Sequence, residues 1–183
     1  MSSALVVVDM QRDLCLNARR REKVVAALPS ILRLIDACSA AGCLIVYSVF
    51  SLPPDDEQFE RFGDRYCIEG TPGAELISEL LPLKGLKMAK QKHSVFFETD
   101  LDQMLRERGV RRVLFAGLQT QICILTSAAD ANFRGYKPLA VRECVISSND
   151  QAKADALAWI SRYVGGVLSV DEAIASVGGS CRE

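Results

Sequence analysis

Short apolar runs alternate along this chain with longer segments whose apolar residues recur at helical spacing, and this alternation constrains the fold more than any other feature. A short apolar run between turn signals is typical of a buried strand, and the longer segments are typical of crossover helices. Their alternation predicts βαβ units around a parallel sheet. We predict strands at 4–8, 44–48, 86–89, 113–117, 138–141 and 167–169, and helices at 23–41, 73–81, 100–108, 121–134 and 150–162.

Three local signals refine this pattern. Ser169 and Glu172 have the spacing of a capping box, which predicts a short terminal helix. Pro29 falls inside the first helical segment, so that helix kinks there or begins nearer Leu28. The segment 51–66 is polar and has no clear period, which predicts a long loop of the kind that serves as a lid or a partner surface.

Size and charge exclude several classes of protein. The chain has 183 residues, 49% of them hydrophobic, and shows no internal repeat or linker, so we expect a single domain spanning 1–183. A net charge of −1 gives no overall field that would recruit nucleic acid or an acidic membrane. We interpret the arginines at 19–21 as a solvated loop and helix start. No apolar stretch approaches the roughly 18 residues of a membrane span, and no basic segment precedes the first apolar run, so we expect neither a span nor a signal peptide.

The cysteines indicate a reducing environment. Seven of them, at positions 15, 38, 43, 67, 123, 144 and 181, form no CxxC pair and no zinc spacing. This pattern is typical of reduced thiols, so we expect a cytoplasmic protein. We expect Cys15 to pack in a loop, and we place Cys144 and Ser147 in the turn after the fifth strand.

One cysteine differs from the others in its surroundings. Cys123 follows a glycine and a polar turn at the start of a predicted helix, where the helix dipole and unpaired N–H groups favour thiolate over thiol. Asp9 comes just after the first predicted strand, and Lys90 just after the third. Since ligands bind at the carboxyl ends of parallel strands, near the switch in strand order, we expect these side chains in one crevice. They supply a base, a cation and a thiol.

Four segments around these residues carry a recognisable pattern: VVDMQRD at 7–13, GTPGAEL at 70–76, KQKHSVFFETDL at 90–101 and AGLQTQIC at 116–123. In this order they resemble the isochorismatase-like cysteine hydrolases, and the resemblance extends from Ala4 to about Ser148. It implies a three-layer α/β/α doubly wound sandwich with a six-stranded, mainly parallel sheet, which agrees with the periodicity. Family members are usually dimers or larger, so it also implies a homo-oligomer.

The resemblance also implies roles for individual residues. Asp9, Lys90 and Cys123 correspond to the family's catalytic triad. The family's cis peptide corresponds to Leu118–Gln119, and the N–H groups of Gln119 and Cys123 correspond to its oxyanion hole. The implied reaction is hydrolysis of a carbon–nitrogen bond of a small molecule through a thioester on the cysteine.

Departures from the family's patterns narrow the substrate. Nicotinamidases of the family hold a metal with an aspartate and histidines, whereas the only histidine here is His93, so we expect no metal and no cofactor. We interpret His93 as a structural or pocket-edge residue. Family members that cleave a vinyl ether lack the nucleophilic cysteine. Cys123 therefore favours an amide, ureido or carbamoyl substrate.

Several residues near the site have two interpretations each. Lys92, two positions beyond Lys90, also points inward if the third strand extends, although a solvated surface lysine is the commoner case. Leu14, Phe50 and Leu118 follow the first, second and fourth strands and are candidates for the pocket walls or for ordinary core.

Two other classes of function stay open at the level of sequence. A thiol redox sensor of the same fold needs a resolving cysteine within reach of Cys123, and the sequence does not place Cys15 or Cys144 well enough to exclude one. A non-catalytic oligomeric scaffold keeps the fold but has no need of three reactive groups at one sheet edge. Isochorismatase-type vinyl ether hydrolysis is less favoured than either.

Overall fold

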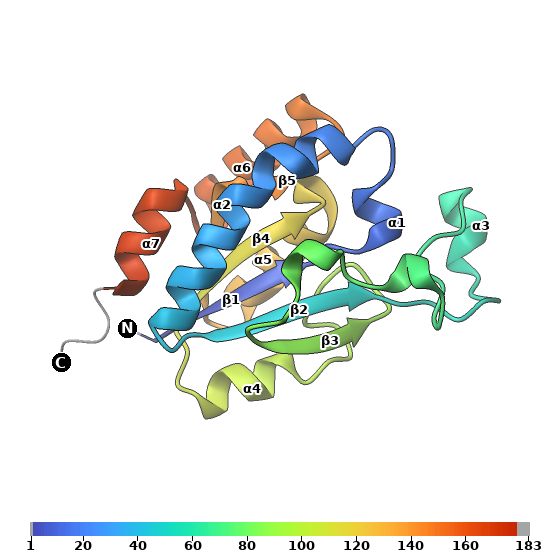
Figure 1. Ribbon diagram of the computed structural model, residues 1–183. Helices are drawn as coiled ribbons and strands as arrows, with labels where there is room; N and C mark the ends of the chain where they lie inside the picture. Colours follow the sequence, from blue (N-terminus) through green and yellow to red (C-terminus); the bar gives the residue numbers. More distant parts are fainter. Residues whose placement is uncertain (1, 179–183) are drawn as a thin grey trace.

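Six parallel strands form one sheet in the computed structural model, which describes residues 2–178 (Figure 1). The strands are β1 (Ser3–Val8), β2 (Leu44–Phe50), β3 (Leu86–Lys90), β4 (Arg112–Leu118), β5 (Lys137–Ile146) and β6 (Gly166–Leu168). Their spatial order is β3-β2-β1-β4-β5-β6. The predicted parallel sheet is confirmed. β5 extends further than predicted, so Cys144 lies inside a strand and not in the turn after it.

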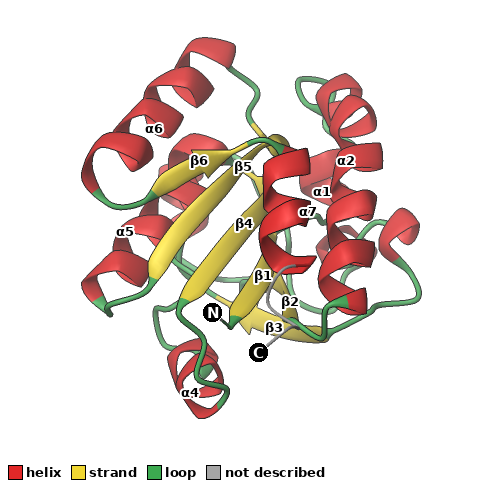
Figure 2. Cartoon of the chain, turned by 90° about the vertical axis from the view of Figure 1, so that its left-hand side faces the viewer, coloured by secondary structure: helices red, strands yellow, loops and turns green. Residues whose placement is uncertain are grey.

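Helices cover both faces of the sheet (Figure 2). The longer ones are α2 (Arg21–Ala40), α4 (Leu101–Glu107), α5 (Leu125–Phe133), α6 (Asp150–Tyr163) and α7 (Val170–Gly178). α2 and α7 pack on one face, and α4, α5 and α6 pack on the other. The predicted three-layer α/β/α architecture is therefore confirmed. None of the described helices combines the length and the apolar character needed to cross a membrane.

The central strand β1 is buried on both faces. Leu5 and Val7 join the core beneath α2 and α7, whereas Val6 and Val8 join the core beneath α4, α5 and α6. This double burial explains why the strand appears in the sequence as an unbroken apolar run. It also fixes the position of Asp9, which follows the strand directly.

Two local helix signals have different outcomes. α2 continues through Pro29, so a start near Leu28 is wrong. Pro29 lies on the exposed face of the helix, where water can bond to the backbone carbonyl that the proline leaves without a donor. The capping box is confirmed, because Glu172 N–H donates to Ser169 Oγ at 3.2 Å and Ser169 N–H donates to Glu172 Oε2 at 2.7 Å.

The predicted helix at 73–81 is wrong. The stretch forms two separate 3₁₀ turns, Pro72–Ala74 and Ser78–Leu80, with extended chain between them. That extended chain pairs with the segment after β1, where Arg12 N–H donates to the Glu75 carbonyl at 2.9 Å. Tertiary hydrogen bonds have replaced the helical ones that the local pattern favours.

The segment 51–66 is more ordered than a plain loop. It contains the short helix α3 (Gln58–Phe62), which extends beyond the carboxyl end of β2 (Figure 1). A β-bridge between Leu52 and Ile68 joins the start of this segment to the chain just beyond its end. A second short helix that was not predicted, α1 (Arg12–Cys15), follows β1.

The strand order places the switch point between β1 and β4. From β1 the chain builds outward to β3 on one side, and from β4 it builds outward to β6 on the other. Gly117 allows these two strands to approach closely, because a Cβ there would lie 2.1 Å from the Val8 carbonyl oxygen and its φ is +100°. The crevice at the carboxyl ends of β1 and β4 is where a fold of this kind binds its ligand.

Candidate active site

The carboxyl ends of β1, β3 and β4 bring the three predicted catalytic residues together. Asp9 follows β1, Lys90 is the last residue of β3, and Cys123 lies in the turn after β4. Lys90 Nζ lies 2.8 Å from Asp9 Oδ2 and 3.7 Å from Cys123 Sγ. All three residues are buried. A carboxylate, an ammonium group and a thiol thus form one contiguous cluster.

The neighbouring strand holds Asp9 in place. Asp9 N–H donates to the Ser48 carbonyl at 3.0 Å, and the Ser48 hydroxyl donates to Asp9 Oδ1 at 2.9 Å. The backbone of Asp9 has a φ of +52°, which turns the chain sharply at the end of β1. One carboxylate oxygen is therefore used for positioning, and the other faces the lysine.

Lys90 is a buried cation with several partners. Its Nζ also donates to the Lys92 carbonyl at 3.1 Å and lies 4.9 Å from the centre of the Phe50 ring. Burial lowers the pKa of Lys90, but the negative charge of Asp9 and the contact with Cys123 outweigh it, so the pKa is raised and the lysine stays protonated. Lys92 itself is exposed and contributes only its backbone, as expected for a solvated surface lysine.

Cys123 lies in a π-helical turn, Thr120–Ile124, that leads directly into α5. Such turns recur at functional sites. The turn closes on Gln119, whose carbonyl accepts the N–H of Ile124 at 3.1 Å and whose own N–H bonds to the Cys123 sulfur. The Leu118–Gln119 peptide is cis, at the position that the family resemblance implies.

The Cys123 thiol is harder to ionise than its place at a helix start suggests. Burial raises the pKa of Cys123 to about 12, and the charge of Asp9 adds to the rise, whereas Lys90 and the Gln119 N–H oppose it. The Gln119 N–H lowers the pKa, as expected at a helix start, but the cost of burying a charge exceeds this effect and the roughly 0.3–1 kcal/mol that a helix dipole supplies. At rest the residue is a thiol beside a base.

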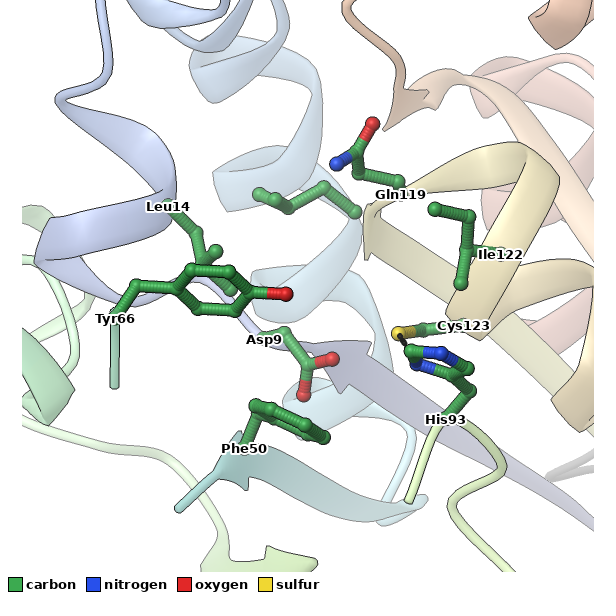
Figure 3. Close-up of a pocket in the computed structure, with 9 residues that line it drawn as sticks. Asp9, Leu14, Phe50, Tyr66, His93, Gln119, Ile122 and Cys123 are labelled. Atoms are coloured by element: carbon green, nitrogen blue, oxygen red, sulfur yellow. Dashed lines mark hydrogen bonds between the residues drawn. The ribbon is translucent and has the colours of Figure 1, made fainter. Parts of the chain in front are cut away.

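His93 lies at the rim of this cluster (Figure 3). Its Nδ1 lies 3.8 Å from Cys123 Sγ, and its ring stacks on Phe50 with 6.1 Å between the ring centroids. Burial, together with the charge of Lys90, lowers the pKa of His93, so the imidazole is neutral at pH 7. This position matches the pocket-edge interpretation of the histidine.

A small cavity opens beside Cys123 (Figure 3). The three candidate wall residues all line it, as do two residues that sequence reasoning missed. Tyr66 was missed because the segment 51–66 has no period, and Ile122 could have been found from its position beside the cysteine. The full lining is Asp9, Leu14, Phe50, Tyr66, His93, Leu118, Gln119, Ile122 and Cys123.

Gln11 is a supporting residue that sequence reasoning did not single out. Its Nε2 donates to the carbonyls of Phe50 and Ala74, each at 2.7 Å, and its Oε1 accepts the Phe50 N–H at 2.7 Å. One buried amide thus ties the ends of β1 and β2 to the 3₁₀ turn beside them. Its place two residues after Asp9 was the available signal.

Metal-binding clusters and free thiols decide which chemistry the site can offer. Across 2–178, no group of three or more His, Cys, Asp or Glu side chains gathers where it could hold a metal ion. The cysteines of this range are free thiols. Cys15 packs in the core as expected, but it lies in the short helix α1 and not in a loop. Cys181 lies outside the described residues. A thiol, a carboxylate, an ammonium group and a neutral imidazole are thus the reactive groups of the site.

Known proteins are similar to this chain over nearly its whole length. A family model described as the isochorismatase domain matches residues 3–172. The ureidoacrylate amidohydrolase RutB of Enterobacter sp. (strain 638) is 29% identical over 202 aligned residues, which cover 92% of this chain and 86% of the relative.

Two solved structures are similar to the chain throughout. The N-carbamoylsarcosine amidase from Thermoplasma acidophilum has 30% identity and a TM-score of 0.85, covering 94% of this chain and 98% of the other. The nicotinamidase PncA from Bacillus subtilis has 27% identity and a TM-score of 0.85, covering 92% of this chain and 100% of the other. Both matches are long enough to include the strands that carry the cluster.

Proposed function

The chain belongs to the isochorismatase family of hydrolases, and we propose that it is a cysteine hydrolase that cleaves the carbon–nitrogen bond of a small amide, ureido or carbamoyl compound. One observation carries the proposal. Lys90 Nζ contacts both Asp9 and Cys123 within a buried cluster that opens on a cavity. This arrangement has the parts that nucleophilic catalysis by a thiol requires.

In the first step Asp9 acts as general base. Because the pKa of Cys123 is raised to about 12, the thiol keeps its proton until the substrate carbonyl is in place. Asp9 Oδ2 takes that proton as the sulfur attacks the carbonyl carbon, and the Lys90 ammonium stabilises the negative charge that passes through the sulfur. The Lys90 ammonium lies 2.8 Å from Asp9 Oδ2, so the base is paired with a cation inside a buried site.

The tetrahedral intermediate needs donors for its oxyanion. We assign this role to the backbone N–H groups of Gln119 and Cys123, since the Gln119 N–H already points at the sulfur. Asp9 then returns the proton to the departing nitrogen, which leaves as ammonia or an amine. Water attacks the thioester with Asp9 again as base, and the thiol is regenerated. No step requires a cofactor.

The names of related proteins agree with this chemistry. A ureidoacrylate amidohydrolase, an N-carbamoylsarcosine amidase and a nicotinamidase each act, by name, on a carbon–nitrogen bond. The free cysteine thiol of the cluster also argues against vinyl ether hydrolysis, for which a nucleophile is not needed. We further propose a cytoplasmic setting, which the six free thiols among the described residues support.

Ammonia release from a panel of primary amides, ureido acids and carbamoyl compounds tests the proposal. We expect Cys123→Ala to lower kcat/KM by about 10³-fold or more. Cys43→Ala is the matched control, because Cys43 lies just before the amino end of β2, whereas the proposed site lies at the carboxyl ends of the strands. Mass spectrometry of the quenched reaction is expected to find an acyl group on Cys123. Unchanged turnover in Cys123→Ala would refute the proposal.

A further inference from the structure

A second, wider hollow adjoins the reactive cavity. Three residues, Leu14, Tyr66 and Gln119, line both spaces. In Figure 3, Leu14 and Tyr66 lie on the side of the reactive cavity opposite His93. The wider hollow has a volume of about 540 Å³ and is open to solvent. A molecule that places one end at Cys123 can therefore extend past Tyr66 into it.

The walls of this hollow carry an excess of positive charge. Arg19, Arg20 and Arg65 face it, together with two carboxylates, Asp13 and Asp64. One net positive charge remains. That balance suits a monoanion such as a carboxylate better than a dianion such as a phosphate.

Two of these charged groups, Asp13 and Arg65, are already engaged in holding the chain. Asp13 Oδ2 accepts the Cys67 N–H at 2.8 Å. Arg65 donates to the Pro54 carbonyl and lies 4.8 Å from the centre of the Phe59 ring. These contacts order the segment that carries Tyr66.

Arg20 differs from the neighbouring arginines in its burial. Arg19 and Arg21 are exposed, as expected for a solvated loop, but Arg20 is half-buried. Its Nε is buried without a hydrogen-bond partner among the described residues. Burial lowers the pKa of Arg20, and the groups that oppose this lowering are Cys15, Tyr66 and Cys67. A buried donor left unpaired on a charged group is costly, which suggests that an acceptor completes it.

We propose that this arginine-lined hollow binds a carboxylate of the substrate, with Arg20 as its main partner, so that the substrate is a small amide with a carboxylate at its far end. The inference rests on the proposed amide hydrolysis and adds the substrate class. Guanidinium groups bind carboxylates through paired N–H donors. Leu14 and Tyr66 line the passage between the two spaces, and an aliphatic spacer would contact them. Burial raises the pKa of Tyr66 to about 12, so its hydroxyl stays protonated and adds no repelling charge.

Matched pairs of compounds test this preference for a carboxylate. The monoamides of succinic, glutaric and adipic acids each carry one, and the corresponding diamides are neutral and nearly isosteric. For the wild-type protein we expect kcat/KM for the best monoamide to exceed that for its diamide by about tenfold to a hundredfold, the range for a hydrogen bond to a charged group. Arg20→Gln is expected to lower this ratio to near one, largely through KM. Arg20→Lys keeps the charge and restores part of the ratio. Arg108→Gln, at an exposed arginine after α4, is the control and keeps the wild-type ratio.

Binding to Cys123→Ala separates this inference from the proposed hydrolysis. Calorimetry with the same monoamides is expected to show binding that Arg20→Gln, added to Cys123→Ala, weakens about tenfold or more. If no compound is turned over but this binding and its loss are observed, the carboxylate site stands and the proposed hydrolysis of these amides fails. If the diamides are hydrolysed as well as the monoamides, or if the preference persists in Arg20→Gln, the carboxylate site is refuted and the hydrolase is not.

Discussion

Cys15 and Cys123 are both buried thiols whose ionisation is opposed by the charge of Asp9, and their surroundings differ in what a nucleophile needs. Cys15, in α1, is fully buried in the core beneath α2. Cys123 lines the reactive cavity, with Lys90 Nζ at 3.7 Å and His93 Nδ1 at 3.8 Å from its sulfur. Burial raises the pKa of both thiols to about 12.

The comparison shows that the resting pKa does not distinguish the reactive thiol from the structural one. What distinguishes Cys123 is access to a cavity, a base that bonds to it and a cation beside both. In the proposed mechanism, thiolate character is therefore created during the reaction, when Asp9 takes the proton.

Asp9→Asn is expected to have the largest effect, a fall in kcat of about 10⁴-fold, because the residue carries every proton transfer of the proposed cycle. Asp36→Asn is the matched control, since Asp36 forms an exposed ion pair with Lys84. Steady-state kinetics on the amide identified from the panel measures both. Circular dichroism checks the fold, because Lys90 loses its buried partner. Activity within tenfold of the wild type in a folded Asp9→Asn protein would contradict the assignment of the base.

Lys90→Met is expected to lower kcat by about 10²-fold, through the loss of charge stabilisation at the sulfur. It also leaves the Asp9 carboxylate buried without its cation, which costs about 3–5 kcal/mol of stability. Lys92→Met is the control, because Lys92 is exposed and is expected to retain wild-type activity. Kinetics and urea unfolding of the two variants settle which lysine serves the site. A larger loss in Lys92→Met would reverse the assignment.

Alkaline stability is expected to respond equally to both thiols. An unfolded thiol releases its proton near its ordinary pKa of 9.0, whereas each folded thiol keeps its proton until about pH 12. The free energy of unfolding therefore falls as pH rises through this window, by about 1.4 kcal/mol per pH unit for each thiol. Cys15→Ala and Cys123→Ala should each make this fall shallower by that amount in urea unfolding between pH 8 and 11. An unchanged slope in either variant would show that the thiol ionises in the folded protein.

His93→Gln is expected to have the smallest effect, a decrease in kcat of less than about tenfold. The lowered pKa of His93 leaves a neutral ring that shapes the rim, while Asp9 handles the protons. The dependence of kcat/KM on pH between 5 and 8 should be the same in the variant and the wild type. A loss above about 10²-fold, with a changed pH profile, would make His93 a proton-transfer residue.

The sequence predicted those parts of the molecule where a local pattern and the tertiary structure agree. Strands buried on both faces, such as β1, have no alternative to an apolar run, and parallel topology then brings Asp9 and Cys123 to one edge. The helix at 73–81 failed because its backbone bonds to the segment after β1.

The site itself could be predicted only in part. The identity of the clustered residues followed from topology, but the ionisation of Cys123 did not, because burial is a property of the folded surroundings. Tyr66 and Arg20 come from segments without periodicity and meet at the wider hollow only through the fold. Their contacts had no signal in spacing or composition.

The most direct test of the account is the rate at which iodoacetamide alkylates Cys123 and Cys15 in the same native protein at pH 7, resolved by peptide mass spectrometry. We expect Cys123 to react at least about a hundredfold faster than Cys15, and Asp9→Asn to slow Cys123 alone, because only Cys123 has both access and a base. Equal rates for the two thiols, or a Cys123 rate that Asp9→Asn leaves unchanged, would contradict the claim that Asp9 activates Cys123.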